Sequence, residues 1–162
     1  MECEKKTQKI LISWAFICVA LCMIFIVVYK YNSMELKEFA LDENTISDLP
    51  DYYEYGIDPI NIENGIVTIT GWAVNKNENL DYVNRKILLF DEDNTIVEVK
   101  TASYDRNLTW FLNNGHNYDY GGIIGKCQTS QLEENKKYSI YFLIIESDQT
   151  QYLIDTHTIL EI

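Results

Sequence analysis

Residues 66–74 read IVTITGWAV, and this stretch decides the predicted fold. Apolar residues alternate with Thr along it, which is the period-two pattern of a half-buried β-strand. The dipeptide Asn64-Gly65 stands directly before it, and Asn-Gly is a strong hairpin signal because both residues accept positive φ. The sequence therefore predicts a hairpin in which 60–62 pairs with 66–74.

Similar short β-type stretches, separated by turn-type residues, continue to the end of the chain. They are 60–62, 66–74, 86–90, 95–101, 108–112, 121–127, 137–146, 150–156 and 158–162. We count about seven to nine strands and no convincing helix among them, which favours a β-sandwich or barrel over alternating βαβ units. We predict an all-β fold, an immunoglobulin-like β-sandwich, over residues 58–162.

An uncharged apolar stretch precedes the β-type region. Residues 10–29 read ILISWAFICVALCMIFIVVY and contain no Pro or Gly. A helix of this length spans about 30 Å, the thickness of the hydrocarbon core of a bilayer. Lys9 and Lys30 bracket it. We predict a single transmembrane helix over 10–30 that contacts membrane lipid, and no small-residue cleavage pattern follows it.

The lysines on either side of this span predict its orientation. Lys5, Lys6 and Lys9 precede it, whereas Lys30 and Lys37 follow it, and this bias favours a cytoplasmic N-terminus. We therefore expect a single-pass protein of the cell membrane, with a short cytoplasmic tail at 1–9 and an extracytoplasmic C-terminal domain.

The residues between the span and the predicted sandwich, 31–57, are expected to form a juxtamembrane connector. Within them, 32–41 extends the helix or starts a short one, since Asn32 and Glu35 have capping-box spacing. Residues 43–59 are acidic, rich in Tyr and contain both prolines of the chain, so they predict an extended connector or a first edge strand.

The chain is strongly acidic, with a formal net charge of −12 over 162 residues. Residues 31–162 contain 9 basic and 23 acidic side chains. This balance argues against a nucleic-acid partner, because phosphate binding depends on clustered Lys and Arg. Cys127 is the one cysteine in that part of the chain, so no disulfide within it is expected.

An ordered series of short motifs also marks this region. The series consists of Gly71-Trp72-Ala73, Tyr104-Asp105-Arg106, Gly121-Gly122-Ile123, and Leu132 with Lys137-Tyr138-Ser139-Ile140. It resembles small immunoglobulin-like domains on bacterial membrane anchors, in proteins associated with the cell surface or its polysaccharides. The chain departs from that pattern in three places, at Asn107-Leu108-Thr109, Asn135-Lys136 and Gly122-Ile123. The resemblance implies an architecture and a location, and it implies no mechanism.

Aromatic residues are the candidates for ligand binding, because flat rings stack on sugar rings. Strict alternation along 66–74 exposes Trp72 beside Thr68 and Thr70. The favoured alternative is a bulge at Gly71 that reverses the register and buries Trp72 in the core. Trp110 and Phe111 are adjacent, so one of them faces outward in a regular strand.

Tyrosines on neighbouring loops complete the candidate site, with Asp105, Asn117 and Asp119 close by. Arg106 belongs to this patch, although a structural pair with a nearby carboxylate is the favoured role for it. The candidate binding residues are Trp72, Tyr104, Arg106, Trp110, Tyr118 and Tyr120.

Support for catalysis or for a cofactor is weak. Gly-rich phosphate loops, nucleophile elbows and the usual zinc spacings do not occur. His116, His157 and Cys127 lie far apart in sequence, and the acidic run 91–94 is better explained as a solvated turn than as a calcium site. We therefore predict no catalytic, cofactor or metal residues.

These observations lead to a ranked set of functions. The first is a non-catalytic extracytoplasmic module that binds a cell-surface glycan or protein. The second is an accessory subunit of a membrane complex, for which Cys18, Cys22 and Ala15 give the span a small-residue stripe that permits helix packing. A surface enzyme acting on polysaccharide is the third.

Overall fold

The computed structural model describes residues 2–32, 34–80 and 83–162, and within the first helix it describes no side chain at 2–11, 13 or 30–32. The chain divides into two compact units, Met1–Ser33 and Met34–Ile162.

The first unit is one helix, α1 (Glu2–Asn32). It contains the helix predicted over 10–30. Its described apolar side chains are exposed, among them Trp14, Phe16 and Phe25. Among the described residues, no helical stretch has both the length and the apolar character that a membrane crossing requires. The flanking Lys9 and Lys30 lie outside the described side chains.

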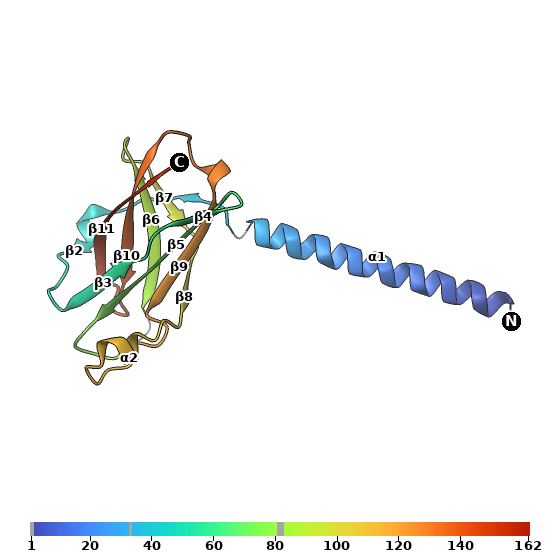
Figure 1. The fold of residues 1–162 in the computed structure, drawn as a ribbon, viewed down its shortest axis with the longest axis horizontal. Coiled ribbons are helices and arrows are strands. Elements are labelled where there is room, and N and C mark those ends of the chain that lie inside the picture. The colour runs from blue at the N-terminus through green and yellow to red at the C-terminus, as the bar shows by residue number, and fades with distance from the viewer. Residues whose placement is uncertain (1, 33, 81–82) are drawn as a thin grey trace. The chain divides into compact units, whose positions relative to one another are not determined.

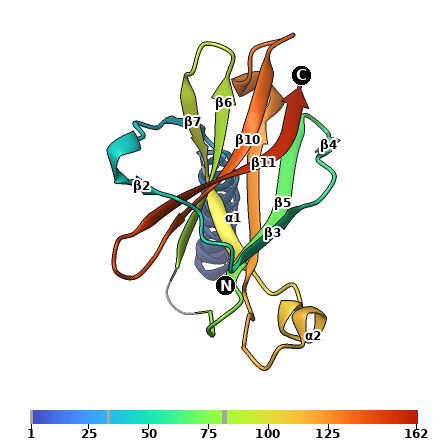
Figure 2. The ribbon, with the colours of Figure 1, turned by 90° about the vertical axis from the view of Figure 1, so that its left-hand side faces the viewer.

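The second unit consists of two β-sheets (Figures 1 and 2). The six-stranded sheet has the order β1 (Lys37–Glu38), β7 (Ile96–Val99), β6 (Asn84–Asp91), β10 (Lys137–Ile145), β11 (Gln151–Glu161) and β2 (Ile46–Ser47). The five-stranded sheet has the order β3 (Tyr53–Ile57), β5 (Ile66–Asn75), β9 (Gly122–Gln128) and β8 (Thr101–Tyr104), with β4 (Asn61–Glu63) also on β5. The prediction of an all-β sandwich is confirmed, but the two sheets contain eleven strands among the described residues where seven to nine were predicted.

The core lies between the two sheets and follows the alternation seen in the sequence. Val67, Ile69 and Ala73 of β5 point into it and are at most 2% exposed. Phe142 of the six-stranded sheet packs directly on Gly71, where an added Cβ would lie 2.6 Å from the Phe142 ring. A glycine is needed there because it lets the ring approach the backbone.

Two predicted strand boundaries differ from the structure. The predicted strand 95–101 is two strands in different sheets, β7 and β8, because the chain changes sheet at Lys100. Conversely, 150–156 and 158–162 form the single strand β11. Its register shifts opposite Ile140 and Tyr141, where Thr156 and His157 are left unpaired as a bulge. His157 takes a positive φ of 54° there.

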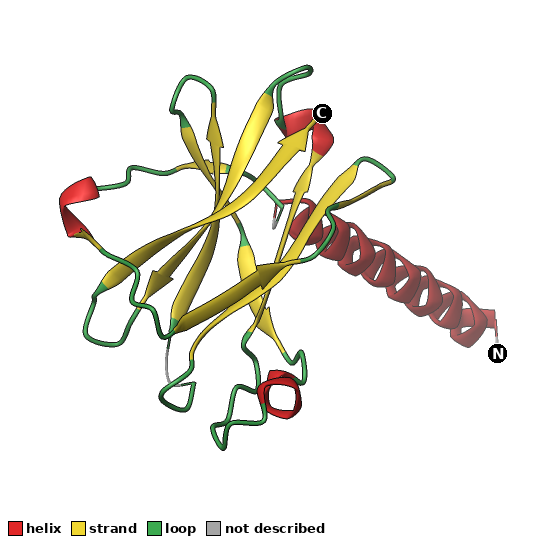
Figure 3. Cartoon of the chain, turned by 60° about the vertical axis from the view of Figure 1, so that its left-hand side comes forward, coloured by secondary structure: helices red, strands yellow, loops and turns green. Residues whose placement is uncertain are grey.

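Residues 108–112, predicted as a strand, form the short helix α2 (Leu108–Leu112) (Figure 3). Left-handed residues bound it, with φ of 55° at Asn107 and 42° at Asn113. In a helix, side chains four residues apart share a face, so Leu108 and Leu112 pack on the same apolar cluster. The prediction was wrong because this side-chain packing outweighs the β propensity of five apolar residues.

The segment 31–57, expected as a connector, contributes three strands to the sheets. β1 pairs with β7, β2 pairs with β11 in parallel, and β3 is an edge strand on β5. The alternative of a first edge strand within 43–59 is therefore confirmed. The 3₁₀ turns Glu43–Thr45 and Thr129–Gln131 complete the described structure.

Candidate functional site

The helix α2 lies at one end of the sandwich (Figure 1), and a second, smaller apolar cluster packs beneath it. Val74, Leu108 and Tyr118 are buried in it, and Trp72, Leu80 and Leu112 pack against them. Hydrogen bonds tie its loops together. The Tyr118 hydroxyl donates to the carbonyl of Lys76 at 2.9 Å, and the Leu80 amide donates to the carbonyl of Asn117 at 2.8 Å. The cluster gives α2 and its loops a fixed base.

One row of residues across the five-stranded sheet alternates glycine with aromatic side chains. Gly56 pairs with Trp72, Trp72 with Gly122, and Gly122 with Tyr104. A Cβ at Gly56 would lie 2.7 Å from Nε1 of Trp72, and one at Gly122 would lie 2.7 Å from Cε1 of Tyr104. Residues directly opposite each other share a face of a sheet, so both rings lie flat on the outer face.

Trp72 keeps the strict alternation, and the bulge expected at Gly71 does not form. The register passes through Gly71 without a shift on both sides of β5. Gly71 and Trp72 pair with Ile57 and Gly56 of β3, and Gly71 pairs with Ile123 of β9. The Trp72 side chain is half-buried nonetheless. Phe111 of α2 approaches it edge-on, with ring centroids 6.4 Å apart and an interplanar angle of 70°. The ring is covered from outside the sheet and does not enter the core between the sheets.

An ion pair lies beside this row. The Arg106 guanidinium binds both carboxylate oxygens of Asp58, with Nη2 to Oδ1 at 2.6 Å. Nη1 also donates to the Tyr104 hydroxyl at 3.1 Å, and the Thr70 hydroxyl donates to Asp58 at 2.8 Å. The hydrogen bond from Arg106 lowers the pKa of Asp58, and Asp58 raises the pKa of Arg106. The structural pair expected for Arg106 is therefore present, with Asp58 as its partner.

Three aromatic rings, two on α2 and one just before β9, are open to solvent. Trp110 is 83% exposed, Phe111 68% and Tyr120 62%. A hydrogen bond joins the residues that directly precede Trp110 and Tyr120: the Thr109 hydroxyl donates to the Asp119 carboxylate at 3.0 Å. We call the set Trp72, Tyr104, Trp110, Phe111 and Tyr120 the aromatic surface.

Of the six candidate binding residues, two are not part of this surface: Arg106 is held in the ion pair beside it, and Tyr118 lies beneath it. The second case needs an explanation from Tyr118 itself. Its side chain is 0% exposed, and its hydroxyl also accepts a hydrogen bond from Asn114 at 2.9 Å. It is a core residue that supports the loops. Sequence reasoning missed Phe111 and Asp58. Phe111 was signalled by its place next to Trp110, whereas a partner 48 positions away from Arg106 has no local signal.

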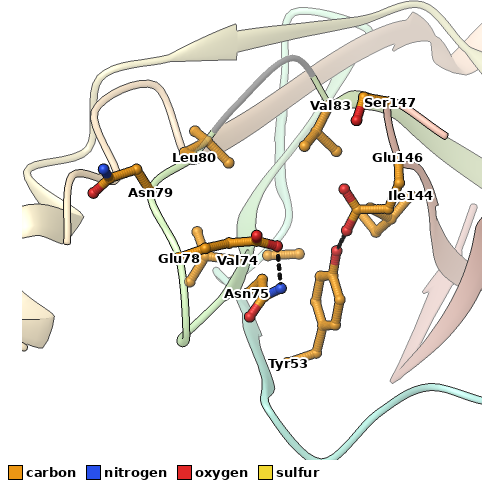
Figure 4. Close-up of a pocket in the computed structure, with 11 residues that line it drawn as sticks. Tyr53, Val74, Asn75, Glu78, Asn79, Leu80, Val83, Ile144, Glu146 and Ser147 are labelled. Carbon is orange, nitrogen blue, oxygen red and sulfur yellow. Dashed lines mark hydrogen bonds between the residues drawn. The ribbon is translucent and has the colours of Figure 1, made fainter.

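A small polar cavity lies near the same end of the sandwich (Figure 4). Its volume is about 70 Å³, and the Tyr53 hydroxyl points across it to Glu146, to which it donates a hydrogen bond. Asn75 donates similarly to Glu78. Burial raises the pKa of Glu146. The cavity has room for a few water molecules and is well below the roughly 300 Å³ of a typical ligand pocket.

A larger hollow, of about 370 Å³, lies beside β1 at the opposite end of the second unit. Leu36, Val97 and Leu132 give it an apolar wall, and Glu35 and Glu38 give it an acidic rim. It contains none of the candidate binding residues.

The chemistry of the aromatic surface is that of reversible stacking and hydrogen bonding. Among the described residues, no group of three or more His, Cys, Asp or Glu side chains has the arrangement of a metal site. His116 packs near Tyr118, His157 lies on β11 and Cys127 is buried in the core. Comparisons with known protein families, curated proteins and solved structures find no match for this chain.

Proposed function

We propose that the second unit is an immunoglobulin-like, non-catalytic module that binds a glycan through the aromatic surface. The observation that carries the proposal is the exposure of Trp110, Phe111 and Tyr120 together at one end of a rigid sandwich. Large exposed apolar patches on soluble domains mark binding sites, and binding residues are commonly carried by loops on a rigid scaffold. The resemblance to bacterial surface domains supports the architecture and the extracytoplasmic location of such a module.

The charge of the unit favours a neutral glycan. Residues 31–162 have 14 more acidic than basic side chains, and this excess repels anionic polymers. Arg106, the cation nearest the aromatic row, is already matched by Asp58. Hydroxyl groups of a neutral sugar find acceptors and donors in Asp58, Arg106 and Thr70 while the rings stack on its faces.

We propose further that residues 10–29 anchor the module in the cell membrane, with the N-terminus cytoplasmic and the module extracytoplasmic. The support is the uncharged sequence of this stretch and its helical backbone within α1. The chain enters the second unit at β1, which pairs with β7. Trp72 and Tyr104 of the aromatic surface lie on β5 and β8, in the other sheet.

An array of neutral and anionic oligosaccharides, probed with the full chain in detergent, tests the glycan proposal. We expect binding to neutral glycans that Trp110→Ala and Phe111→Ala each weaken about tenfold, the equivalent of 1.4 kcal/mol. Ile159→Ala is the matched control, because Ile159 is an apolar side chain 54% exposed on β11, far from the aromatic surface. Equal binding by all three variants would contradict the proposal, and capture of a surface protein instead would redirect it.

The second candidate is an accessory subunit of a membrane complex. It is favoured by the hollow beside β1, whose apolar wall and acidic rim suit a partner segment with apolar and basic side chains. Replacing residues 10–29 by an unrelated apolar helix separates the two functions. Glycan binding survives that exchange under the first proposal, whereas a subunit that assembles through the helix loses its co-purifying partners.

A further inference from the structure

Tyr120 has an unfavourable backbone conformation. Its φ is 64°, in the left-handed region that costs an L-residue roughly 1–2 kcal/mol. Its ring is 62% exposed, so burial of the side chain does not offset this cost. Glycine, or to a lesser degree asparagine, takes this conformation more easily. The fold alone therefore gives no reason for a tyrosine at this position.

The backbone of Tyr120 is held by a buried guanidinium. Arg85 of β6 is 8% exposed and donates from Nη2 to the carbonyl of Tyr120 at 2.7 Å and from Nη1 to that of Gly121 at 2.8 Å. Nη2 also donates to the Ser103 hydroxyl at 3.1 Å. Burial lowers the pKa of Arg85 to about 10, which leaves the side chain charged at neutral pH. Charge-assisted hydrogen bonds of this kind are about twice as strong as neutral ones.

The next residue closes the other side of this turn. The Gly121 amide donates to the carbonyl of Tyr118 at 2.8 Å. A Cβ at Gly121 would lie 2.6 Å from Cδ1 of Leu108. The backbone at Tyr120 is thus fixed between Arg85 and the apolar cluster under α2, while its ring remains in solvent.

We infer that Arg85 is a positioning residue, which fixes Tyr120 in the left-handed conformation so that its ring forms part of the ligand surface. Strained residues persist where the surrounding structure holds them, and they concentrate at functional sites. The inference rests on the proposed glycan binding. If Arg85 acts in this way, the ligand surface is already formed in the free protein, and the strain at Tyr120 lowers the stability of the fold in return for the fixed position of its ring.

The first test separates stability from binding. Tyr120→Gly relieves the left-handed strain, so we expect the midpoint of thermal unfolding of the full chain to rise by about 2–4 °C. The same variant loses the ring, so its affinity for a neutral β-1,4-linked N-acetylglucosamine or glucose hexamer falls about tenfold. Asn135→Gly is the control, because Asn135 also has a positive φ, of 63°, and lies on a different loop. It leaves the affinity unchanged.

The second test asks whether Arg85 acts through Tyr120. Arg85→Lys keeps the charge but cannot span both carbonyls, so we expect it to weaken hexamer binding in the natural background and to have no further effect in the Tyr120→Gly background. A general loss of structure would weaken binding in both backgrounds. Ser103→Ala removes one acceptor of Arg85 and serves as a milder variant if Arg85→Lys does not fold.

The outcomes separate this inference from the proposed function. If the natural protein binds neither hexamer nor any other neutral glycan, the proposed function fails, and the ligand role of Tyr120 fails with it. If the natural protein binds and Tyr120→Gly binds equally well, the inference alone is overturned. A weakening by Arg85→Lys of the same size in both backgrounds also overturns it.

Discussion

Asp58 and Arg106 form the best-defined ion pair next to the aromatic surface, and the pair makes stability depend on pH. The pKa of Asp58 is lowered in the folded chain, so its contribution is complete above its ordinary pKa and is lost as pH falls through the lowered value. We expect Asp58→Asn to lower the free energy of unfolding by about 1 kcal/mol at pH 7, because a partly exposed ion pair contributes no more than this. Urea unfolding at pH 7 and at pH 3 measures the difference.

The comparison between the two pH values decides this prediction. The difference in unfolding free energy between Asp58→Asn and the natural protein narrows at pH 3, because the carboxyl of the unfolded chain takes up a proton below its ordinary pKa and this removes part of the stabilisation. Glu134→Gln is the control, since Glu134 is exposed, and it shows little change at either pH. A gap that widens on acidification would mean that Asp58 is not stabilised as a carboxylate.

Cys127 gives a second prediction at the level of a single residue. Its thiol is 0% exposed, and burial raises its pKa to about 11. A thiol that is both buried and protonated reacts slowly with alkylating reagents. We expect N-ethylmaleimide at pH 7 to label Cys127 only in urea, as measured by mass spectrometry of its peptide. Equally fast labelling of Cys127 with and without urea would show that the core is open to the reagent.

Single residues also show what the sequence can predict about the site. The face on which Trp72 lies follows from alternation along 66–74, and the pairing confirms it. The covering of its ring by Phe111 does not follow, because that contact joins segments far apart in the chain. For the same reason, Tyr118 looked like a surface residue beside Asn117 and Asp119. Its burial depends on Val74 and Leu108, which no local pattern connects to it.

At the level of elements, most strands were predictable, because period-two alternation and hairpin turns are local signals. The helix α2 was not, because five residues of LTWFL fit a strand and a helical turn equally well. The left-handed residues Asn107 and Asn113 at its ends are visible in the sequence only as asparagines. The division of 95–101 between two sheets was equally hidden, since it depends on which neighbours β7 and β8 find.

Contact between the sheets at Gly71 gives a prediction for these elements. Gly71→Ala places a Cβ 2.6 Å from both the Gly56 carbonyl oxygen and the Phe142 ring, so the two sheets must separate. We expect a loss of about 2–3 kcal/mol of unfolding free energy in urea titration. Gly115→Ala is the matched control. Its Cβ meets nothing within 4 Å, although its φ of 92° costs about 1 kcal/mol. Equal losses would place Gly71 away from the interface between the sheets.

At the scale of the whole molecule, the proposed function requires one part of the chain to lie in a lipid bilayer and the other to lie in water. The second unit has a closed apolar core and an acidic surface, which suit water. The described side chains of α1 expose Trp14, Phe16 and Phe25, and an apolar surface of this size is costly in water. A lipid bilayer is the solvent that we propose for residues 10–29.

That proposal predicts how the molecule partitions. We expect the full chain to enter the detergent phase of a Triton X-114 extraction, and protease added to intact cells to remove residues 34–162. A variant in which 10–29 is replaced by Gly and Ser enters the aqueous phase, because it loses the favourable free energy of transferring apolar side chains out of water, about 0.8 kcal/mol for each buried CH₂. A variant carrying an unrelated apolar helix of equal length behaves as the natural chain. Recovery of the natural chain in the aqueous phase would contradict the anchor, and resistance to the added protease would contradict the extracytoplasmic orientation.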